Sequence, residues 1–354
     1  MTRRRILWIG SYTFGSGPGE SAAGVQRVRL DTGSGALEDA GVAAESGNPS
    51  FVALSADGGA VYAVNELEAG RVSGFAVIGG QGLKEQGSVP TGGSSPCHLL
   101  VHPGGRHLVT ANYGDGSVSV HALAADGAPG EPVQRFTHTG SGPDTERQEG
   151  PHAHSVYLAP GGGHLLVVDL GTDELRCHPF DPASPEPVGP GHIAARFDPG
   201  TGPRHLAAHS SGHLYVAGEL DSRVHILRWD ADTARAETVG SLPATLSGNE
   251  GNYPAEIALS PDGSRLYVAN RGADTIATFE VSADGARLRH LADTPTGGAW
   301  PRHFAQVSGY IVVANQNSST LTSLPVDPVD GIPGEARHSL DVPDPVCVRP
   351  AFAG

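Results

Sequence analysis

One phrase recurs along this chain and constrains its fold more than any other feature. Two clear copies are SPCHLLVHPGGRHLVTANYG, which starts at Ser95, and NYPAEIALSPDGSRLYVANRG, which starts at Asn252. Each copy has a proline, a short apolar run, a glycine turn, a second apolar run and a terminal polar residue. A repeat of this kind indicates that equivalent residues occupy equivalent places in a repetitive architecture.

The spacing of the copies predicts the repeating unit. The opening prolines are separated by 47, 55, 52, 51, 47 and 44 residues, and they are Pro49, Pro96, Pro151, Pro203, Pro254, Pro301 and Pro345. This period is near that of propeller blades. The apolar runs are short, rich in Val, Leu and Tyr, and separated by glycine turns, which is typical of a β-hairpin. Two weaker strands follow, at 117–123 and 132–138 in the second copy, so each copy predicts a four-stranded blade.

The two ends of the chain predict how the ring closes. The final copy, PVCVRP, stops after its first strand, whereas ILWIGSYT near the N-terminus matches a second strand, with Tyr12 on Tyr113 and Ser11 on Asn112. We therefore expect an all-β fold, a seven-bladed β-propeller that forms a single domain over 1–354. Its last blade is closed by the N- and C-terminal strands, which removes an open sheet edge. An open β-solenoid or two sandwich domains are the alternatives, but solenoid repeats are shorter.

Composition limits the partners of this chain. The formal net charge of −15 disfavours nucleic acid or an anionic membrane surface, and no segment is long enough to span a bilayer. The three cysteines, Cys97, Cys177 and Cys347, lie far apart, which predicts buried reduced thiols in a cytoplasmic protein. Because no pair has metal-ligand spacing, we expect no metal and no other cofactor.

Hairpin geometry predicts where the functional residues gather. The first strand of each copy starts where the second strand ends, so these positions surround one mouth of the central channel. Copies that break the repeat there single out His152, His154, Arg204, Glu219, Arg271 and Arg302. At the same mouth, the candidates for substrate binding are His152, Arg302, His303 and Asn112. The alternatives are salt bridges between blades for the charged residues and turn capping for asparagine.

Two long connections lead into the same mouth. They cover 137–150 and 246–252, and both are polar and contain glycine. Loops of this kind beside a pocket are candidate lids or specificity loops, and tolerated surface insertions are the alternative.

Several phrases together resemble a known family. GPHAHSV, GPRHLA, VAGELDSRV, NYPAEIALSPDGSRLYVANRG and WPRHF are similar to the lactonase family of seven-bladed propellers. That family includes a bacterial 6-phosphogluconolactonase and the fungal-type 3-carboxy-cis,cis-muconate lactonizing enzyme. The resemblance covers nearly the whole chain and implies catalysis without a metal by His154, Arg204, Glu219 and Arg271. One departure is GEL, where the family often has NEL, so Gly218 removes a polar side chain beside Glu219.

The chemistry of these residues fits a small anionic lactone or carboxylate substrate. The guanidinium forks of Arg204 and Arg271 suit a phosphate or carboxylate, and the ordinary pKa of histidine suits His154 to proton transfer. Glu219 could activate water or orient the histidine. We expect hydrolysis of 6-phosphogluconolactone.

Three other functions remain open from the sequence. The first is cyclisation of 3-carboxy-cis,cis-muconate by the same four residues. The second is a non-catalytic propeller that binds protein partners. The third is a metal-dependent lactonase, in which His152 and His154 join Asp169 or Glu219 as ligands.

Overall fold

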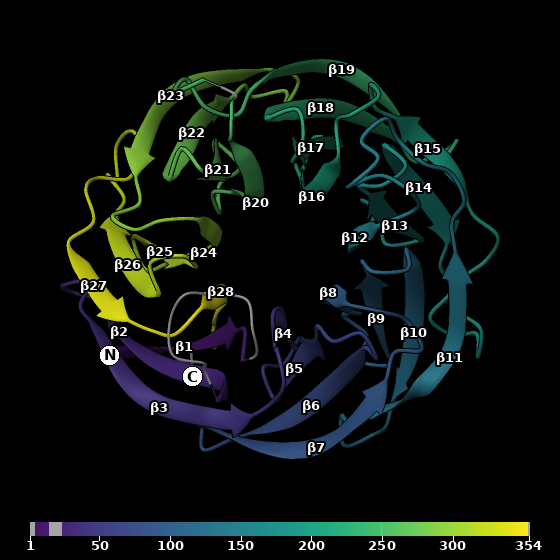
Figure 1. The fold of residues 1–354 in the computed structure, drawn as a ribbon, viewed down its shortest axis with the longest axis horizontal. Helices are drawn as coiled ribbons and strands as arrows, with labels where there is room; N and C mark the ends of the chain where they lie inside the picture. Colours follow the sequence, from purple (N-terminus) through teal and green to yellow (C-terminus); the bar gives the residue numbers. More distant parts are fainter. Residues whose placement is uncertain (1–3, 14–22, 249, 353–354) are drawn as a thin grey trace.

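Seven antiparallel four-stranded sheets surround a central axis in the computed structural model of this chain (Figure 1). The structure describes residues 4–13, 23–248 and 250–352. Every described regular element is a β-strand. The predicted all-β, seven-bladed propeller is therefore confirmed.

Each blade runs from an inner strand beside the axis to an outer strand at the rim. The inner strands are β4 (Val52–Leu54), β8 (Pro96–Val101), β12 (Ala153–Leu158), β16 (Pro203–Ala208), β20 (Tyr253–Leu259), β24 (Pro301–Val307) and β28 (Pro345–Pro350). The second strands are β1 (Arg4–Ser11), β5 (Ala60–Asn65), β9 (His107–Asn112), β13 (His164–Asp169), β17 (His213–Gly218), β21 (Arg265–Arg271) and β25 (Tyr310–Asn315).

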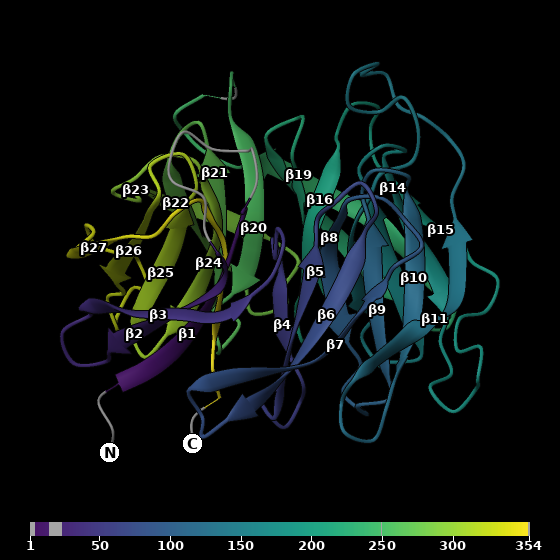
Figure 2. The ribbon, with the colours of Figure 1, turned by 60° about the horizontal axis from the view of Figure 1, so that its bottom comes forward.

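The outer half of each blade is made of the remaining strands. The third strands are β2 (Gly24–Asp31), β6 (Arg71–Ile78), β10 (Ser117–Leu123), β14 (Glu174–Pro179), β18 (Arg223–Asp230), β22 (Thr275–Val281) and β26 (Thr320–Pro325). The outer strands are β3 (Leu37–Glu45), β7 (Gly82–Pro90), β11 (Pro129–Thr137), β15 (His192–Arg196), β19 (Arg235–Pro243), β23 (Leu288–Pro295) and β27 (His338–Asp341). The connections between strands gather on the two faces of the ring (Figure 2).

The last blade joins the two ends of the chain, as the sequence predicts. Its strand order is β28-β1-β2-β3, and Ser11 pairs with Pro345 as Asn112 pairs with Pro96. Tyr12 is therefore the structural equivalent of Tyr113. Pairing between the terminal strands satisfies the backbone groups that an open ring would leave at a sheet edge.

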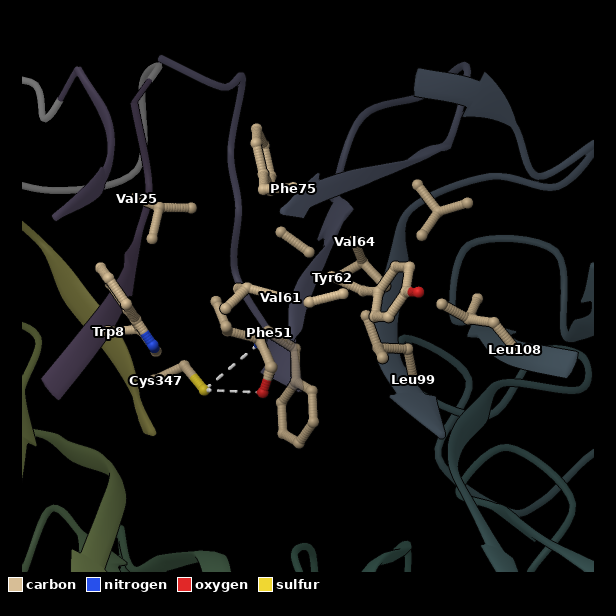
Figure 3. Close-up of a cluster of buried hydrophobic side chains, with 14 residues drawn as sticks. Trp8, Val25, Phe51, Val61, Tyr62, Val64, Phe75, Leu99, Leu108 and Cys347 are labelled. Atoms are coloured by element: carbon tan, nitrogen blue, oxygen red, sulfur yellow. Dashed lines mark hydrogen bonds between the residues drawn. The ribbon is translucent and has the colours of Figure 1, made fainter. Parts of the chain in front are cut away.

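The hydrophobic core lies between neighbouring blades. One cluster joins Trp8 and Cys347 of the last blade to Tyr62 and Phe75 of the next blade (Figure 3). The backbone N–H of Val52 donates to Cys347 Sγ at 3.4 Å across this boundary, as a dashed line in Figure 3 shows. All three cysteines are buried and free, as predicted. Packing between blades therefore fixes how the inner strands meet at the axis.

A β-bulge near the start of six inner strands shapes the channel. In β8, Pro96 pairs with Asn112 and His98 pairs with Ala111, so Cys97 is an extra residue. Corresponding register shifts occur in β12, β16, β20, β24 and β28. Because a bulge adds a residue and re-aims side chains, two successive side chains of one strand can face the axis.

The register corrects two alignments that we drew from the sequence. In the third blade Ala153, and not Pro151, pairs with the last residue of the second strand, Asp169. Hence the bulge residue of that blade is His154, the equivalent of Cys97. In the fourth blade Gly218 pairs with Pro203, so Gly218 takes the place of the repeated asparagine and Glu219 lies one residue beyond it.

No helix among the described residues is long and apolar enough to cross a membrane.

Candidate active site

A polar cavity of about 290 Å³ lies at the mouth that the repeat predicted. Its lining residues are Tyr12, Glu66, Cys97, Tyr113, Arg147, His154, Arg204, Glu219, Arg271 and Arg302. All four predicted catalytic residues are in this set, and so is Arg302. Side chains from distant parts of the sequence therefore meet at one place.

Two repeated positions supply nearly all of the lining. The bulge position gives Cys97, His154, Arg204 and Arg302 from four different inner strands. The position one residue beyond the repeated asparagine or its equivalent gives Tyr12, Glu66, Tyr113, Glu219 and Arg271. Arg147, from the connection between β11 and β12, is the remaining member. The ring thus presents different side chains at equivalent places.

Glu219 is the centre of an arginine cluster. Its Oε2 lies 3.0 Å from Arg204 Nε and 2.7 Å from Arg271 Nη2, and its Oε1 accepts a hydrogen bond from Arg147 Nη2 at 2.6 Å. Glu219, Arg204 and Arg271 are all buried. Removing one partner of such a buried pair is strongly destabilising, because the other charge is left uncompensated.

The carboxylate of Glu219 and the guanidinium groups around it are all ionised at neutral pH. Burial alone would raise the pKa of Glu219, but Arg271, Arg204 and Arg147 together hold it far below its ordinary value. Burial lowers the pKa of Arg271 to about 10, although Glu219 opposes that effect. Glu219 is therefore an anion that orients guanidinium groups, and its lowered pKa makes it a poor base.

A second polar chain lies across the cavity. Arg302 Nη2 donates to the Tyr12 hydroxyl at 2.9 Å, and that hydroxyl donates to Glu66 Oε1 at 2.8 Å. Burial raises the pKa of Tyr12 far above its ordinary value, so its hydroxyl keeps the proton that it donates.

The cavity is cationic although the chain is acidic. Counted over the residues that the structure describes, its lining has four arginines and two glutamates, which leaves a net charge of +2 in a chain of −15. Buried guanidinium groups in a confined site attract phosphate or carboxylate groups. The local charge therefore favours a small anion.

His154 is neutral and borders this cationic surface. Burial lowers its pKa well below 6.5, and the charge of Arg204 lowers it further. Its Nδ1 lies 3.9 Å from Cys97 Sγ, and the thiol is 3.2 Å from the carbonyl oxygen of His154. Burial also raises the pKa of Cys97, so this cysteine is a thiol rather than a thiolate. A neutral imidazole beside a cavity can accept a proton from water.

Comparison with known proteins assigns the family. Residues 6–350 match the family described as "Lactonase, 7-bladed beta-propeller". The chain belongs to this family. The 6-phosphogluconolactonase of Bacillus subtilis (strain 168) is 32% identical over 352 residues, which are 97% of each chain.

Solved structures of lactonases share the whole ring. A putative 6-phosphogluconolactonase from Bacteroides fragilis superposes with a TM-score of 0.90 at 30% identity and covers 99% of each chain. A periplasmic gluconolactonase of Pseudomonas aeruginosa gives a TM-score of 0.91 at 28% identity, over 99% of this chain and 100% of the other. The names of these lactonases differ in whether the lactone carries a phosphate.

In this lactonase ring, three of the predicted substrate-binding residues are not among the cavity-lining residues: His152, Asn112 and His303. His152 Nδ1 contacts the carbonyl oxygen of Tyr113 at 2.7 Å, and its ring stacks on that tyrosine with centroids 4.5 Å apart. Asn112 is fully buried and donates to the hydroxyls of Ser117 and Ser119, both at 3.0 Å. His152 therefore supports a lining residue, and Asn112 stabilises its own blade; a substrate contact by either residue stays a prediction.

His303 belongs to a deeper layer of the channel. It follows the bulge residue Arg302, just as His205 follows Arg204, and both imidazoles approach the carboxylate of Glu256. Nδ1 of His205 lies 2.7 Å from Glu256 Oε2, and Nε2 of His303 lies 3.6 Å from the same oxygen. Burial lowers the pKa of His303 to about 3. This residue forms the floor beneath the cavity rather than its lining.

The remaining lining residues carry only partial signals in the sequence. Tyr12 and Tyr113 are equivalent in the repeat, but the repeat alone does not show that their position faces the cavity. Cys97 is predicted as a buried thiol, and Glu66 follows the second strand of its copy. Arg147 lies in the predicted loop 137–150, and its Nη2 also lies 3.3 Å from the Tyr113 hydroxyl. Its place in the site depends on the path of that loop, which no repeat predicts.

The described residues of the other predicted loop, 246–248 and 250–252, are not among the lining residues. Asn252 at its end donates to the Ser222 hydroxyl at 2.7 Å, and Leu246 at its start is exposed. Residue 249 lies outside the described residues. A movement of either loop as a lid stays a prediction.

The described part of the chain holds no group of three or more His, Cys, Asp or Glu side chains arranged to hold a metal ion.

Proposed function

We propose that this protein hydrolyses an anionic sugar-acid lactone, with 6-phosphogluconolactone as its substrate. The observation that carries the proposal is a cationic cavity with a neutral histidine in an acidic chain. Family membership and the relatives named 6-phosphogluconolactonase support the same activity.

The residues divide the reaction between binding and proton transfer. Arg147, Arg204 and Arg271 attract the anion, and Glu219 holds their guanidinium groups in place. Among the described residues, Nη1 of buried Arg204 has no hydrogen-bond partner, so it is free to donate to the oxyanion that forms at the lactone carbonyl.

His154 moves the proton. It takes a proton from the attacking water as the oxygen adds to the carbonyl carbon. The ring C–O bond then breaks, and the imidazolium returns the proton to the departing ring oxygen. The product is the open-chain hydroxy acid, so atoms and charges balance without a further reactant.

The proposal is tested by comparing two substrates. Purified protein is given 6-phosphogluconolactone and, separately, 3-carboxy-cis,cis-muconate, and each rate is corrected for the spontaneous reaction. We expect fast hydrolysis of the lactone. Turnover of the muconate alone would replace hydrolysis by cyclisation, and turnover of neither compound would refute the proposal.

The pH dependence gives an independent prediction. The base form of His154 exists above its pKa, and burial and Arg204 hold that pKa well below 6.5. We therefore expect kcat/KM to stay constant on acidification from pH 8 through pH 6.5. Initial rates over pH 5–8 measure it, and a fall centred on the pKa of an exposed histidine, about 6.5, would contradict the role of His154.

A further inference from the structure

Glu66 is an unexplained carboxylate in the cavity lining. It follows β5 in the first blade, and only the Tyr12 hydroxyl, at 2.8 Å from Oε1, donates to its side chain among the described residues. Its second oxygen, Oε2, is buried and has no hydrogen-bond partner within the described residues. A buried acceptor without a donor costs about 1–3 kcal/mol, so its presence requires an explanation.

Among the described residues no arginine of the site forms a direct ion pair with Glu66, although Arg302 lies near enough to attract it. Nη2 of Arg302 donates to Tyr12, and Nη1 of Arg302 lies 3.5 Å from Gln316 Oε1. The other three lining arginines pair with Glu219, which extends from the fourth blade. The first and fourth blades lie on opposite sides of the seven-bladed ring (Figure 1). Three arginines therefore gather around Glu219 on one side of the cavity, whereas the other side has Arg302, Tyr12 and Glu66, where the Glu66 carboxylate offers a hydrogen-bond acceptor.

This asymmetry restricts how an anion can lie in the cavity. A carboxylate accepts hydrogen bonds and repels another anion, so the anionic group of a ligand is placed on the arginine side. The part of the ligand that faces Glu66 must then donate. Hydroxyl groups of a sugar ring are such donors, whereas the unsaturated tricarboxylate 3-carboxy-cis,cis-muconate, when fully ionised, has none.

We propose that Glu66 accepts a hydrogen bond from a ring hydroxyl of the substrate and thereby selects polyhydroxylated lactones. Tyr12 is the positioning residue, because it holds Oε1 and is itself held by Arg302. The inference rests on the proposed lactone hydrolysis, because it assigns the anionic group of that substrate to the arginine side of the cavity and its ring hydroxyls to Glu66. A site built around a substrate hydroxyl discriminates strongly against the analogue that lacks it.

The test compares two phosphorylated lactones that differ only in hydroxyl groups: 6-phosphogluconolactone and its 2,3,4-trideoxy analogue. The wild type should prefer the hydroxylated lactone. Glu66→Gln should reduce the ratio of the two kcat/KM values by about 10- to 100-fold, the range expected for hydrogen bonds to a charged group. Tyr12→Phe should reduce the ratio less. Glu131→Gln, at an exposed position of β11, is the matched control and should keep the wild-type ratio of kcat/KM values.

A binding measurement separates this inference from the proposed function. Calorimetry with 6-phosphogluconate and its trideoxy counterpart gives a ratio of Kd values that needs no turnover. We expect the wild type to bind the hydroxylated acid more tightly. Glu66→Gln should reduce the ratio of the two Kd values by about 10- to 100-fold, as for kcat/KM. If the ratio of Kd values is equal in wild type and variant, Glu66 does not bind the substrate hydroxyls, whether or not the lactone is hydrolysed. If the ratio changes while neither lactone turns over, only the proposed hydrolysis fails.

Discussion

Replacing His154 by alanine should lower kcat/KM for 6-phosphogluconolactone by about 10²- to 10⁴-fold, the usual contribution of a positioned general base. His154 is the lining side chain with both a neutral form at physiological pH and the capacity to accept a proton from water. The arginines remain charged, and Glu219 is held as a poor base by three guanidinium groups. Loss of the imidazole should therefore lower kcat more than it raises KM.

The control for this variant is His338→Ala on the outer strand β27, which should keep the wild-type rate. Circular dichroism and thermal unfolding show whether each variant is folded. A folded His154→Ala protein with wild-type kcat/KM would show that the proton is moved by another group.

Replacing Glu219 by glutamine should have the largest effect on stability. The change leaves buried Arg204 and Arg271 without their counter-charge, so the free energy of unfolding should fall by about 3–5 kcal/mol. Activity should fall as well, because the guanidinium groups lose the anion that orients them. Denaturant unfolding at neutral pH measures the change.

The matched control is Glu237→Gln, which removes an ion pair with Arg228 in which both side chains are more than half exposed. Exposed pairs contribute about 0–1 kcal/mol, so this variant should unfold almost like the wild type. Equal effects of the two substitutions would show that the Glu219 cluster does not stabilise the fold.

Acidification should remove the difference between wild type and Glu219→Gln. The folded pKa of Glu219 lies below its unfolded value of about 4.3, so its stabilising charge is fully present above that value. It is lost as the pH falls through the folded pKa. The gap in unfolding free energy should therefore be constant from pH 8 to pH 5 and shrink below pH 4.

The ring and its functional mouth were predictable because both follow from the repeat. Copies of one hairpin place equivalent residues around one axis, and positions that depart from the repeat include His154, Arg204 and Arg271. The same alignment wrongly placed Glu219 at the asparagine position, although Gly218 occupies it. A shift of one residue changes which face a side chain occupies, so register decides what reaches the cavity.

Other features of the site depend on geometry that a sequence does not encode locally. The bulge makes His154 the equivalent of Arg204, although PHAH and GPRH suggest different alignments. Arg147 reaches Glu219 because of the path of an irregular loop. Glu66 has no distinguishing sequence context, and its proposed role depends on the cavity and on Oε2, which has no partner within the described residues.

The central claim is that the cationic cavity acts on an anionic lactone, and the charge of the substrate tests it most directly. The measurement is the ratio of kcat/KM for 6-phosphogluconolactone to kcat/KM for unphosphorylated gluconolactone, with purified protein at neutral pH. Two charge-assisted contacts to the phosphate predict a preference on the order of 10²-fold or more for the phosphorylated lactone. Equal values for the two lactones, or faster hydrolysis of the neutral one, would contradict the account.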